Sequence, residues 1–262
     1  MSQSNKSTVA ITGASTGIGA TYADRFAKRG HDLLIIARNE QRLNALAERL
    51  RAETGVKVDI LVADLTDAAD LAKVEDRLAS LPNLGILVNN AGMAAHGGFT
   101  DATSAEIRNL ITLNVTALSQ LSAAVIPRFV ENKAGAIINI ASVVGLAPEL
   151  PLGYYGATKS FVIALSHAMN IELAATGVHV QAVLPAATRT EIWERSGRNV
   201  NDLDGVMDVN ELVDAALAGF DKGETITIPP LHDENLWLTL EDARKAMLPH
   251  LLNGQAAPRY QA

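Results

Sequence analysis

The chain has 262 residues, of which 48% are hydrophobic, and it carries a net charge of −7 and no cysteine. The acidic balance argues against a nucleic-acid-binding protein, which would show a clustered basic face. The lack of cysteine excludes disulfides, thiolate catalysis and cysteine–zinc sites. Apolar segments are spread almost evenly, which favours a single domain over residues 1–262. The polar N-terminus lacks the apolar core of a signal peptide, and no stretch approaches the apolar length that spans a bilayer. We therefore expect a cytoplasmic protein with no membrane partner.

Short apolar runs alternate with amphipathic stretches along the chain. The runs lack strict alternation, as strands that are covered on both faces do. One of the stretches between them, at 40–55, has leucines three and four residues apart and ends at Gly55, which is typical of a helix. This order predicts an α/β fold, a Rossmann-type doubly wound parallel sheet of about seven strands with helices on both faces. The predicted strands are STVAIT at 7–12, DLLIIA at 32–37, VKVDILVA at 56–63, GILVN at 85–89, GAIINIAS at 135–142, VHVQAVLP at 178–185 and TITIP at 225–229.

A glycine-rich turn follows the first strand, where residues 12–19 read TGASTGIG. Its glycines permit positive φ and let a diphosphate approach the backbone N–H groups at a helix N-terminus. The spacing differs from the common G-x-G-x-x-G fingerprint. The same residues match the G-x-S-x-G elbow of hydrolases through Ser15. That alternative is disfavoured because an elbow serine normally follows several strands rather than the first.

Tyr155 and Lys159 stand four residues apart in the run YGATK, thirteen positions after Ser142. On a helix this spacing places both side chains on one face. A cation about 4 Å from the phenol is worth roughly 4 kcal/mol at an effective dielectric near 20, or on the order of three pKa units. We therefore expect the pKa of Tyr155 to fall from about 10 to near 7. Tyr154 lies five residues from Lys159, off its face.

These motifs, with NNAG at 89–92 and Asn114, resemble the short-chain dehydrogenase/reductase family, in its short single-domain branch. They occur in the family's order over at least residues 7–190. The resemblance implies a Rossmann-type fold, a nicotinamide cofactor and a redox reaction at a carbon–oxygen bond. It implies a homodimer or homotetramer as well.

The resemblance also implies a role for each catalytic candidate. Tyr155 would be the general acid in carbonyl reduction and the base in alcohol oxidation. Lys159 would lower the pKa of Tyr155 and bind the nicotinamide ribose. Ser142 would hold the substrate oxygen, and Asn114 would support a water that links Lys159 to solvent. Such chemistry needs a proton donor and electrostatic support for an alkoxide.

Cofactor choice depends on the end of the second predicted strand. Ala37 stands where an NAD enzyme of the family typically has Asp, and Arg38 next to it offers a planar fork to the 2′-phosphate of NADP. We therefore expect NADP rather than NAD. Asp64 resembles the family residue that meets the adenine amino group. Its alternative is helix-start chemistry, which Asp67 offers as well.

After the sixth predicted strand, Ala186 replaces the glycine that usually follows the family proline, and Thr190 stands in the expected place. The cofactor-binding residues that the resemblance implies are Gly13, Ser15, Gly17, Ile18, Gly19, Arg38, Asn39, Asp64, Leu65, Asn90, Ala91, Gly92, Tyr155, Lys159, Pro185 and Thr190.

The long polar stretch 186–208 predicts a mobile loop over the substrate. Its surroundings are mostly apolar, so we expect a medium-sized apolar ketone or aldehyde. Among the polar candidates for substrate contact are His96, Arg189 and Arg195. The other histidines show no ligand spacing, so we expect no metal. The apolar candidates are Met93, Leu146, Leu150, Leu152, Ile192 and Trp193.

The segment after Pro229 looks amphipathic, and we expect Leu236, Leu240 and Met247 to pack into the core, with a lid or subunit contact as the alternative. The functional prediction is an NADP(H)-dependent oxidoreductase that interconverts a ketone or aldehyde and an alcohol. Two alternatives stay open at this point. One is a cofactor-binding regulator or scaffold without catalysis, and the other is a hydrolase that uses Ser15.

Overall fold

The structure is a computed structural model, and it describes residues 6–94, 98–150, 152–191, 199–203 and 205–260. Its residues group into two compact units, Met1–Pro229 and Pro230–Ala262. The first unit holds the whole sheet, and the second holds a single α-helix. The expectation of one domain over 1–262 stays a prediction.

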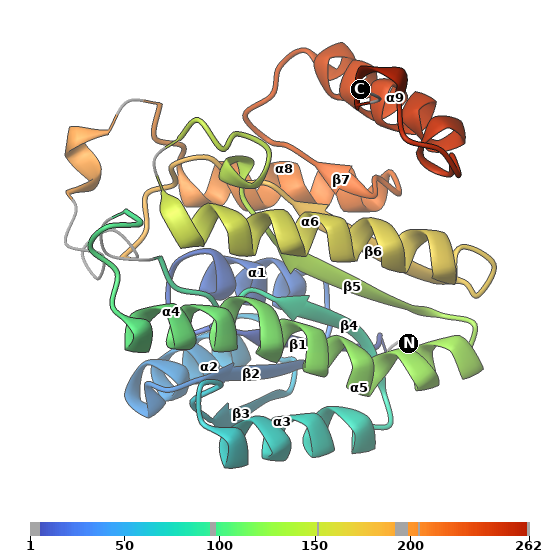
Figure 1. Cartoon of the computed structure of the whole chain (residues 1–262). Coiled ribbons are helices and arrows are strands. Elements are labelled where there is room, and N and C mark those ends of the chain that lie inside the picture. The colour runs from blue at the N-terminus through green and yellow to red at the C-terminus, as the bar shows by residue number, and fades with distance from the viewer. Residues whose placement is uncertain (1–5, 95–97, 151, 192–198, 204, 261–262) are drawn as a thin grey trace. The chain divides into compact units, whose positions relative to one another are not determined.

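The first unit is built on a seven-stranded sheet in the order β3-β2-β1-β4-β5-β6-β7 (Figure 1). All neighbouring strands run parallel. Each predicted run overlaps one observed strand, so the predicted fold class is confirmed. The strands are β1 (Thr8–Thr12), β2 (Leu33–Ala37), β3 (Val58–Val62), β4 (Leu84–Asn89), β5 (Gly135–Ile140), β6 (Val178–Val183) and β7 (Ile226–Thr227).

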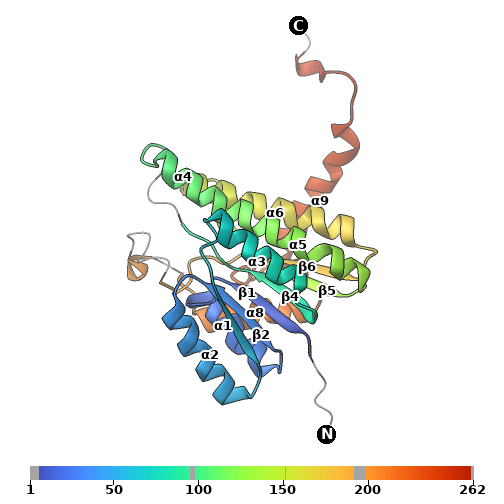
Figure 2. The same cartoon turned by 90° about the horizontal axis from the view of Figure 1, so that it is seen from below.

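Helices cover both faces of this sheet (Figure 2). Side chains of α1, α2 and α8 share one buried cluster with the sheet, and those of α3, α5 and α6 share another. The predicted helix at 40–55 is observed as α2, which ends at Gly55 with φ of 74°. Within the described residues, the α-helices of the first unit are α1 (Gly17–Lys28), α2 (Glu40–Thr54), α3 (Ala68–Ser80), α4 (Ser104–Ile111), α5 (Leu118–Glu131), α6 (Gly153–Leu173) and α8 (Val209–Asp221).

The strand order reverses at β1, whose neighbours are β2 on one side and β4 on the other. In open parallel sheets a ligand binds at such a switch point, beyond the carboxyl ends of the strands. β1 ends at Thr12 and β4 ends at Asn89, so the glycine-rich turn and NNAG both leave the sheet at this edge. The topology alone therefore brings two of the predicted motifs together.

Asn89 lies inside the sheet rather than in the site. Its side-chain amide donates to Ser122 Oγ and to Asn139 Oδ1, both at 2.9 Å, and Asn139 donates in turn to Ser166 Oγ at 2.9 Å. All four side chains are buried. This polar network ties β4 and β5 to α5 and α6, so the first asparagine of NNAG stabilises the sheet.

α4 and α5 are joined without a break by a π-helical segment, Thr112–Ala117. The resulting helix, Ser104–Glu131, is long and apolar enough to cross a membrane by length and composition alone. This corrects the expectation that no stretch of the chain has the apolar length to span a bilayer. A single helix of this kind is weak evidence of a membrane span. Leu121, Val125 and Phe129 on it are buried in the core beneath the sheet.

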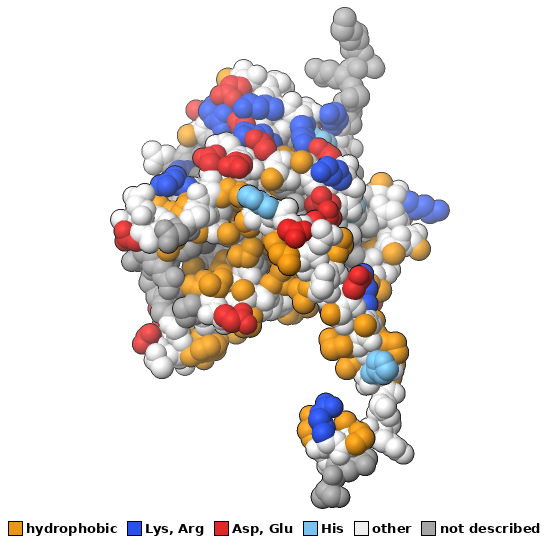
Figure 3. All heavy atoms as spheres, turned by 90° about the horizontal axis from the view of Figure 1, so that it is seen from above, with side chains coloured by type: hydrophobic (Ala, Val, Ile, Leu, Met, Phe, Trp, Pro, Cys, Tyr) orange, Lys and Arg blue, Asp and Glu red, His pale blue; other side chains and the backbone are white. Residues whose placement is uncertain are grey.

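α4 and α6 lie side by side in the first unit (Figures 1 and 2). They expose Ile111, Phe161 and Ile171, which are large apolar side chains. Hydrophobic side chains also gather over a broad area of the face shown in Figure 3. Apolar surface of this kind marks contact sites on many proteins.

The second unit contains α9 (Glu234–Leu251). Leu236, Leu240 and Met247 are exposed on it, so the expectation that they pack into a core is wrong. Its buried side chain is Glu241, which accepts two hydrogen bonds from Arg244 at 2.9 Å.

Candidate active site

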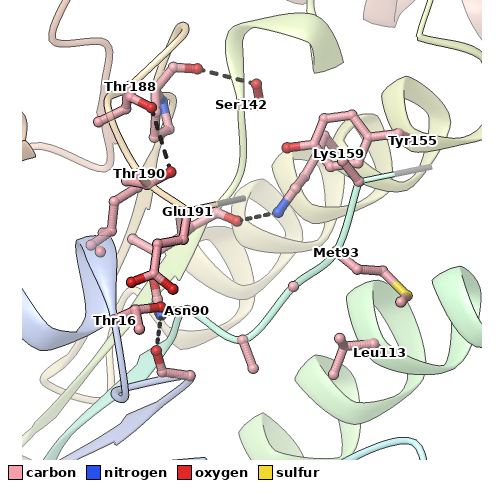
Figure 4. A pocket seen from close by; sticks show the side chains of 18 of the residues that line it. Thr16, Asn90, Met93, Leu113, Ser142, Tyr155, Lys159, Thr188, Thr190 and Glu191 are labelled. Atoms are coloured by element: carbon pink, nitrogen blue, oxygen red, sulfur yellow. Dashed lines mark hydrogen bonds between the residues drawn. The ribbon is translucent and has the colours of Figure 1, made fainter. Parts of the chain in front are cut away.

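A cleft of about 820 Å³ lies at the carboxyl edge of the sheet (Figure 4). Sixteen of the predicted site residues line it, and Gly19 and Asn114 do not. The sixteen are Gly13, Ser15, Gly17, Ile18, Arg38, Asn39, Asp64, Leu65, Asn90, Ala91, Gly92, Ser142, Tyr155, Lys159, Pro185 and Thr190. The cleft extends from Arg38, which follows β2, to Tyr155 on α6.

The turn between β1 and α1 is built to receive an anion. Gly13 and Gly17 have φ of 66° and 54°, a conformation that glycine adopts without strain. The N-cap residue of α1, Thr16, makes no side-chain capping bond, and the first turn of α1 holds no acidic residue. By contrast, Asn39 caps α2 and Asp67 caps α3 through their side chains. The N–H groups of α1 are therefore left for a ligand that lies in the cleft.

Gly19 supports this turn from behind. A Cβ at Gly19 would lie 2.5 Å from both Asn90 Nδ2 and the Gly13 carbonyl oxygen, too close for any side chain. Asn90 Nδ2 donates to the Thr12 carbonyl at 2.9 Å and to the Gly13 carbonyl at 3.2 Å. Gly19 and Asn90 thus fix the backbone that faces the cleft, and Asn90 lines the cleft as well.

Tyr155 and Lys159 point into the opposite end of the cleft from the first turns of α6 (Figure 4). Lys159 Nζ donates to the Ile140 carbonyl at 2.8 Å and lies 5.7 Å from the centre of the Tyr155 ring. Lys159 is almost fully buried. The strand end of β5 therefore holds the ammonium in place beside the phenol.

Burial dominates the proton affinities of this pair. It raises the pKa of Tyr155 to about 12, against a hydrogen bond with Ser142 that lowers it. Burial lowers the pKa of Lys159 to about 8. The expectation of a Tyr155 pKa near 7 is therefore wrong for this structure. It assumed an ammonium close to the phenol oxygen, whereas Lys159 is bound to the Ile140 carbonyl and the desolvation of the phenol prevails.

Ser142 follows β5 and lies at the same end of the cleft as Tyr155. Its Oγ donates to the Pro185 carbonyl at 3.1 Å, and Val144 N lies 3.4 Å from the same oxygen (Figure 4). These contacts orient a buried hydroxyl between the ends of β5 and β6. Ser142 and Tyr155 line the same cleft, so the structure brings the two hydroxyl-bearing side chains to one site, as the sequence predicts.

Asn114 lies behind the cleft, in the π-helical segment. Its Oδ1 accepts from Met93 N, and its Nδ2 donates to the Met93 carbonyl, both at 2.9 Å. Nδ2 also donates to Thr158 Oγ1 at 3.1 Å. A Cβ added at Gly92 would lie 3.3 Å from Asn114 Oδ1 and 3.7 Å from Lys159 Nζ, so all three residues adjoin. π-Helical turns often occur at functional sites, and this one places an amide beside the lysine.

The far end of the cleft combines an exposed arginine with a carboxylate. Arg38 Nη1 lies 3.5 Å from Asp64 Oδ2. Burial acts to raise the pKa of Asp64, but hydrogen bonds from Thr66 and the nearby Arg38 lower it below its usual value. Asp67, not Asp64, caps α3. The helix-start alternative for Asp64 is therefore disfavoured, and its carboxylate faces the cleft.

A family model described as short chain dehydrogenase matches residues 7–201. The chain belongs to the short-chain dehydrogenase family. This confirms the predicted resemblance, and the fold and the site geometry agree with it.

Several relatives of this short-chain dehydrogenase have solved structures. A short-chain dehydrogenase from Sphingobium yanoikuyae in complex with NADPH is 60% identical, with a TM-score of 0.96 over 97% of this chain and 100% of its own. The bulky-bulky ketone specific alcohol dehydrogenase from Comamonas testosteroni is 51% identical, with a TM-score of 0.92 over 99% and 100% of the two chains.

A curated relative is the very-long-chain 3-oxoacyl-CoA reductase of Bos taurus, 35% identical over 186 residues. The match covers 70% of this chain but 59% of that protein. This short-chain dehydrogenase thus spans about three fifths of the length of the curated relatives that it matches.

The residues of this short-chain dehydrogenase fit the nicotinamide dinucleotide that the family implies. The uncapped N-terminus of α1 and the positive φ of Gly13 suit a diphosphate. Arg38 and Asp64 stand at the end where the adenosine would lie, and Tyr155 and Lys159 stand at the nicotinamide end. Within the described chain, no group of three or more possible metal ligands comes together. The expectation of no metal stays a prediction.

The substrate end of the cleft is mostly apolar. Met93, Leu150 and Leu152 line it as predicted, and Leu146 does not. His96, Ile192, Trp193 and Arg195 lie outside the described residues. No histidine lines the cleft in the part of the chain that is described.

The described parts of 186–208 carry some order of their own. Thr188 forms a parallel bridge with Met207, and Arg189 donates to Asn201 Oδ1 at 2.9 Å. The segment also supplies Glu191 and Leu203 to the cleft, which the sequence did not indicate. The signal available for Glu191 was its place directly after Thr190.

Proposed function

We propose that this protein is an NADP(H)-dependent oxidoreductase that interconverts a ketone or aldehyde and an alcohol. The observation that carries the proposal is one cleft with Ser142, Tyr155 and Lys159 at one end and Arg38 at the other. The NADPH complex of the 60% identical Sphingobium protein supports the choice of cofactor. A pure cofactor-binding scaffold would not need a buried Lys159 beside Tyr155.

A bound nicotinamide supplies or accepts the hydride. Ser142 and Tyr155 hold the substrate oxygen through their hydroxyl groups, and Tyr155 gives its proton to the alkoxide as that oxygen gains charge. Lys159, fixed by the Ile140 carbonyl, stabilises the phenolate that remains. Asn114 holds the backbone at Met93 and thereby keeps the wall beside Lys159 in place.

The proton affinities favour the reductive direction near neutral pH. A Tyr155 pKa of about 12 keeps the phenol protonated and ready to donate. Alcohol oxidation needs the same group without its proton, so its rate should rise with pH. A Lys159 pKa of about 8 allows the ammonium to exchange a proton near neutrality and resupply the site.

The substrate is a largely apolar ketone with bulky groups on both sides of the carbonyl. Valines and leucines line the cleft that also contains Ser142 and Tyr155, among them Val143, Leu150 and Leu152. Ala186 adds a methyl group there in place of the family glycine. The Comamonas alcohol dehydrogenase, which is specific for bulky-bulky ketones and 51% identical, supports the same substrate class.

The assembly is a homodimer or homotetramer in the cytoplasm that meets small-molecule substrates and no membrane. The exposed apolar side chains of α4 and α6, Ile111, Phe161 and Ile171, support pairing through these helices. Size-exclusion chromatography with light scattering tests the subunit count. A monomer at micromolar concentration would contradict this part of the proposal.

The first experiment is a fluorescence titration of the purified protein with NADPH and NADH, followed by ketone reduction. We expect a clear preference for NADPH and turnover that rises from acetone to aryl alkyl ketones with large groups on both sides. Tyr155→Phe should lower kcat by a factor of about 10³ and leave NADPH affinity within about twofold. Retained turnover in Tyr155→Phe refutes the mechanism, and a preference for NADH refutes the cofactor assignment.

A further inference from the structure

A second arginine, Arg42 in the first turn of α2, does not line the cleft itself but contacts a residue that does. Arg42 Nη1 donates to Glu191 Oε2 at 2.5 Å, although the two residues are 149 positions apart in the sequence. Glu191 lines the cleft directly after Thr190. A Cβ added at Gly17 would lie 3.1 Å from the Thr190 side chain, so this part of the segment adjoins the glycine-rich turn. The pair therefore connects α2 to the opposite wall of the cleft.

Arg42 lies next to two residues of the cleft end where the adenosine is expected. It follows Arg38 by four residues, and Asn39 Oδ1 accepts from Arg42 N at 2.9 Å. The capping bond thus fixes the backbone of Arg42 beside Asn39, which lines the cleft together with Arg38. A guanidinium side chain is long enough to turn from Glu191 toward a group bound between these residues.

Charge balance at this end of the cleft favours such a turn. Among the described lining residues, the acidic groups are Asp64 and Glu191, and the cation near them is Arg38. A phosphate monoester adds a charge of about −1.5 to −2. One arginine that is already beside a carboxylate does not balance such a group, whereas two arginines do.

The Arg42–Glu191 pair is suited to exchange. Its side chains are 44% and 41% exposed, and ion pairs in such surroundings contribute little to stability. A phosphate accepts two parallel hydrogen bonds from a guanidinium and carries more charge than a carboxylate. It is therefore the stronger partner for Arg42.

We propose that Arg42 is the second cation for the 2′-phosphate of NADP(H), and that Glu191 holds Arg42 when the phosphate is absent. The proposal rests on the NADP(H) assignment above. It makes Arg42 a specificity-determining residue, and it makes Glu191 a competitor of the phosphate. Binding of NADPH, but not of NADH, then releases Glu191 and with it the beginning of the 186–208 segment.

The test measures dissociation constants by calorimetry for NADPH, NADH, 2′,5′-ADP and 5′-ADP, with no turnover involved. Arg42→Gln should weaken NADPH and 2′,5′-ADP by a factor of about 10 or more and leave NADH and 5′-ADP within about twofold. Glu191→Gln should tighten the two 2′-phosphate ligands by a few-fold, about 3 or more. In the double variant the gain from Glu191→Gln should disappear, because the cation that it frees is gone.

Arg77→Gln is the matched control. Arg77 forms an exposed ion pair with Asp59 at 3.1 Å and does not line the cleft, so its loss should change none of the four constants. Unchanged NADPH affinity in Arg42→Gln overturns the proposal. A Glu191→Gln variant that binds NADPH and NADH more weakly by the same factor also overturns it, because the ion pair would then help to hold either cofactor. If the wild-type protein prefers NADH, the NADP(H) assignment itself is overturned. The results on the variants alone test the role of Arg42 and Glu191 and not that assignment.

Discussion

Asp24 on α1 and Lys159 on α6 are both buried and charged, but their surroundings differ. Lys159 donates to the Ile140 carbonyl, and within the described part of the chain it forms no ion pair with a carboxylate. Asp24 is surrounded by cationic side chains of α1 and α2. They are Arg25 at 2.8 Å, Lys28 at 2.8 Å and Arg49 at 3.0 Å.

The pKa values follow from these surroundings. Burial acts to raise the pKa of Asp24, yet the hydrogen bonds from its three cations overcome it and lower the pKa to about 2. For Lys159, burial alone lowers the pKa to about 8. A buried charge that serves the fold is neutralised by partners, whereas the buried charge at the active site is left without a counter-ion. The uncompensated charge of Lys159 lowers the stability of the fold, but it keeps the pKa of the ammonium close to neutral pH, where the group can exchange a proton.

The largest expected effect is on Lys159→Met, which removes the uncompensated charge and keeps the volume. Ketone reduction should fall by a factor of about 10³, because the phenolate of Tyr155 loses its cation. The free energy of unfolding at pH 7 should rise by about 2 kcal/mol, since no charge is buried any longer. Turnover and urea unfolding measure the two effects.

The Lys159→Met variant is informative because its activity should fall while its stability rises. A merely disruptive substitution would lower stability and activity together, and that outcome would contradict the reading of Lys159 as an uncompensated charge. Lys73→Met is the matched control, because Lys73 is an exposed residue of α3 outside the cleft. It should leave both quantities unchanged.

Asp24→Asn should have the next largest effect, on stability. The variant keeps the shape of the side chain but leaves three cations around a neutral amide, which should lower the free energy of unfolding by about 3 kcal/mol. Activity below the melting transition should stay at the wild-type level, because Asp24 does not line the cleft. Thermal unfolding measures the change, with Asp59→Asn in an exposed pair as the control. A loss as small as that of Asp59→Asn would contradict the comparison.

Local patterns in the sequence predicted the sheet and most of the site. Apart from β3, where Asp59 is exposed, the strands are short apolar runs that are mostly buried, and the leucines of α2 recur at helical spacing, so neighbours in the sequence decide these elements. Parallel strands then bring their carboxyl ends to one edge. The resemblance to the short-chain dehydrogenase/reductase family implied in addition that TGASTGIG, NNAG, Ser142 and Tyr155 belong to one site.

Contacts between distant segments were not accessible in this way. The bond from Lys159 to the Ile140 carbonyl, the partners of Asp24 on α2, and the Arg42–Glu191 pair depend on side-chain directions that no sequence period encodes. The pKa of Tyr155 was misjudged for the same reason. A spacing of four residues shows that two side chains share a helix face, but not how far their polar ends lie apart or how little water reaches them.

A smaller effect is expected on stability at acidic pH. Asp24 should account for much of the fall in the free energy of unfolding as the pH is lowered. Its pKa is lowered from 3.8 to about 2 on folding. The stabilisation is therefore fully present above pH 4 and is lost as the pH falls through about 2, by about 2 kcal/mol in total. Between pH 5 and pH 2, the free energy of unfolding measured with urea should change less with pH in Asp24→Asn than in the wild type. Equal slopes would mean that other carboxylates carry the acid dependence.

The smallest expected effect is the alkaline limb of ketone reduction. Burial places the pKa of Lys159 at about 8, so the ammonium is charged at pH 7 and mostly neutral at pH 9. The reduction rate at saturating NADPH should therefore fall by a factor of about 10 over this range, since Tyr155 keeps its proton but loses the nearby cation. Over the same interval the folded state gains stability relative to the unfolded state, in which lysine stays charged to about pH 10.5. Lower activity together with higher stability between pH 7 and pH 9 is the signature of an uncompensated buried cation. Loss of both would instead indicate alkaline unfolding and would refute the assignment of this limb to Lys159.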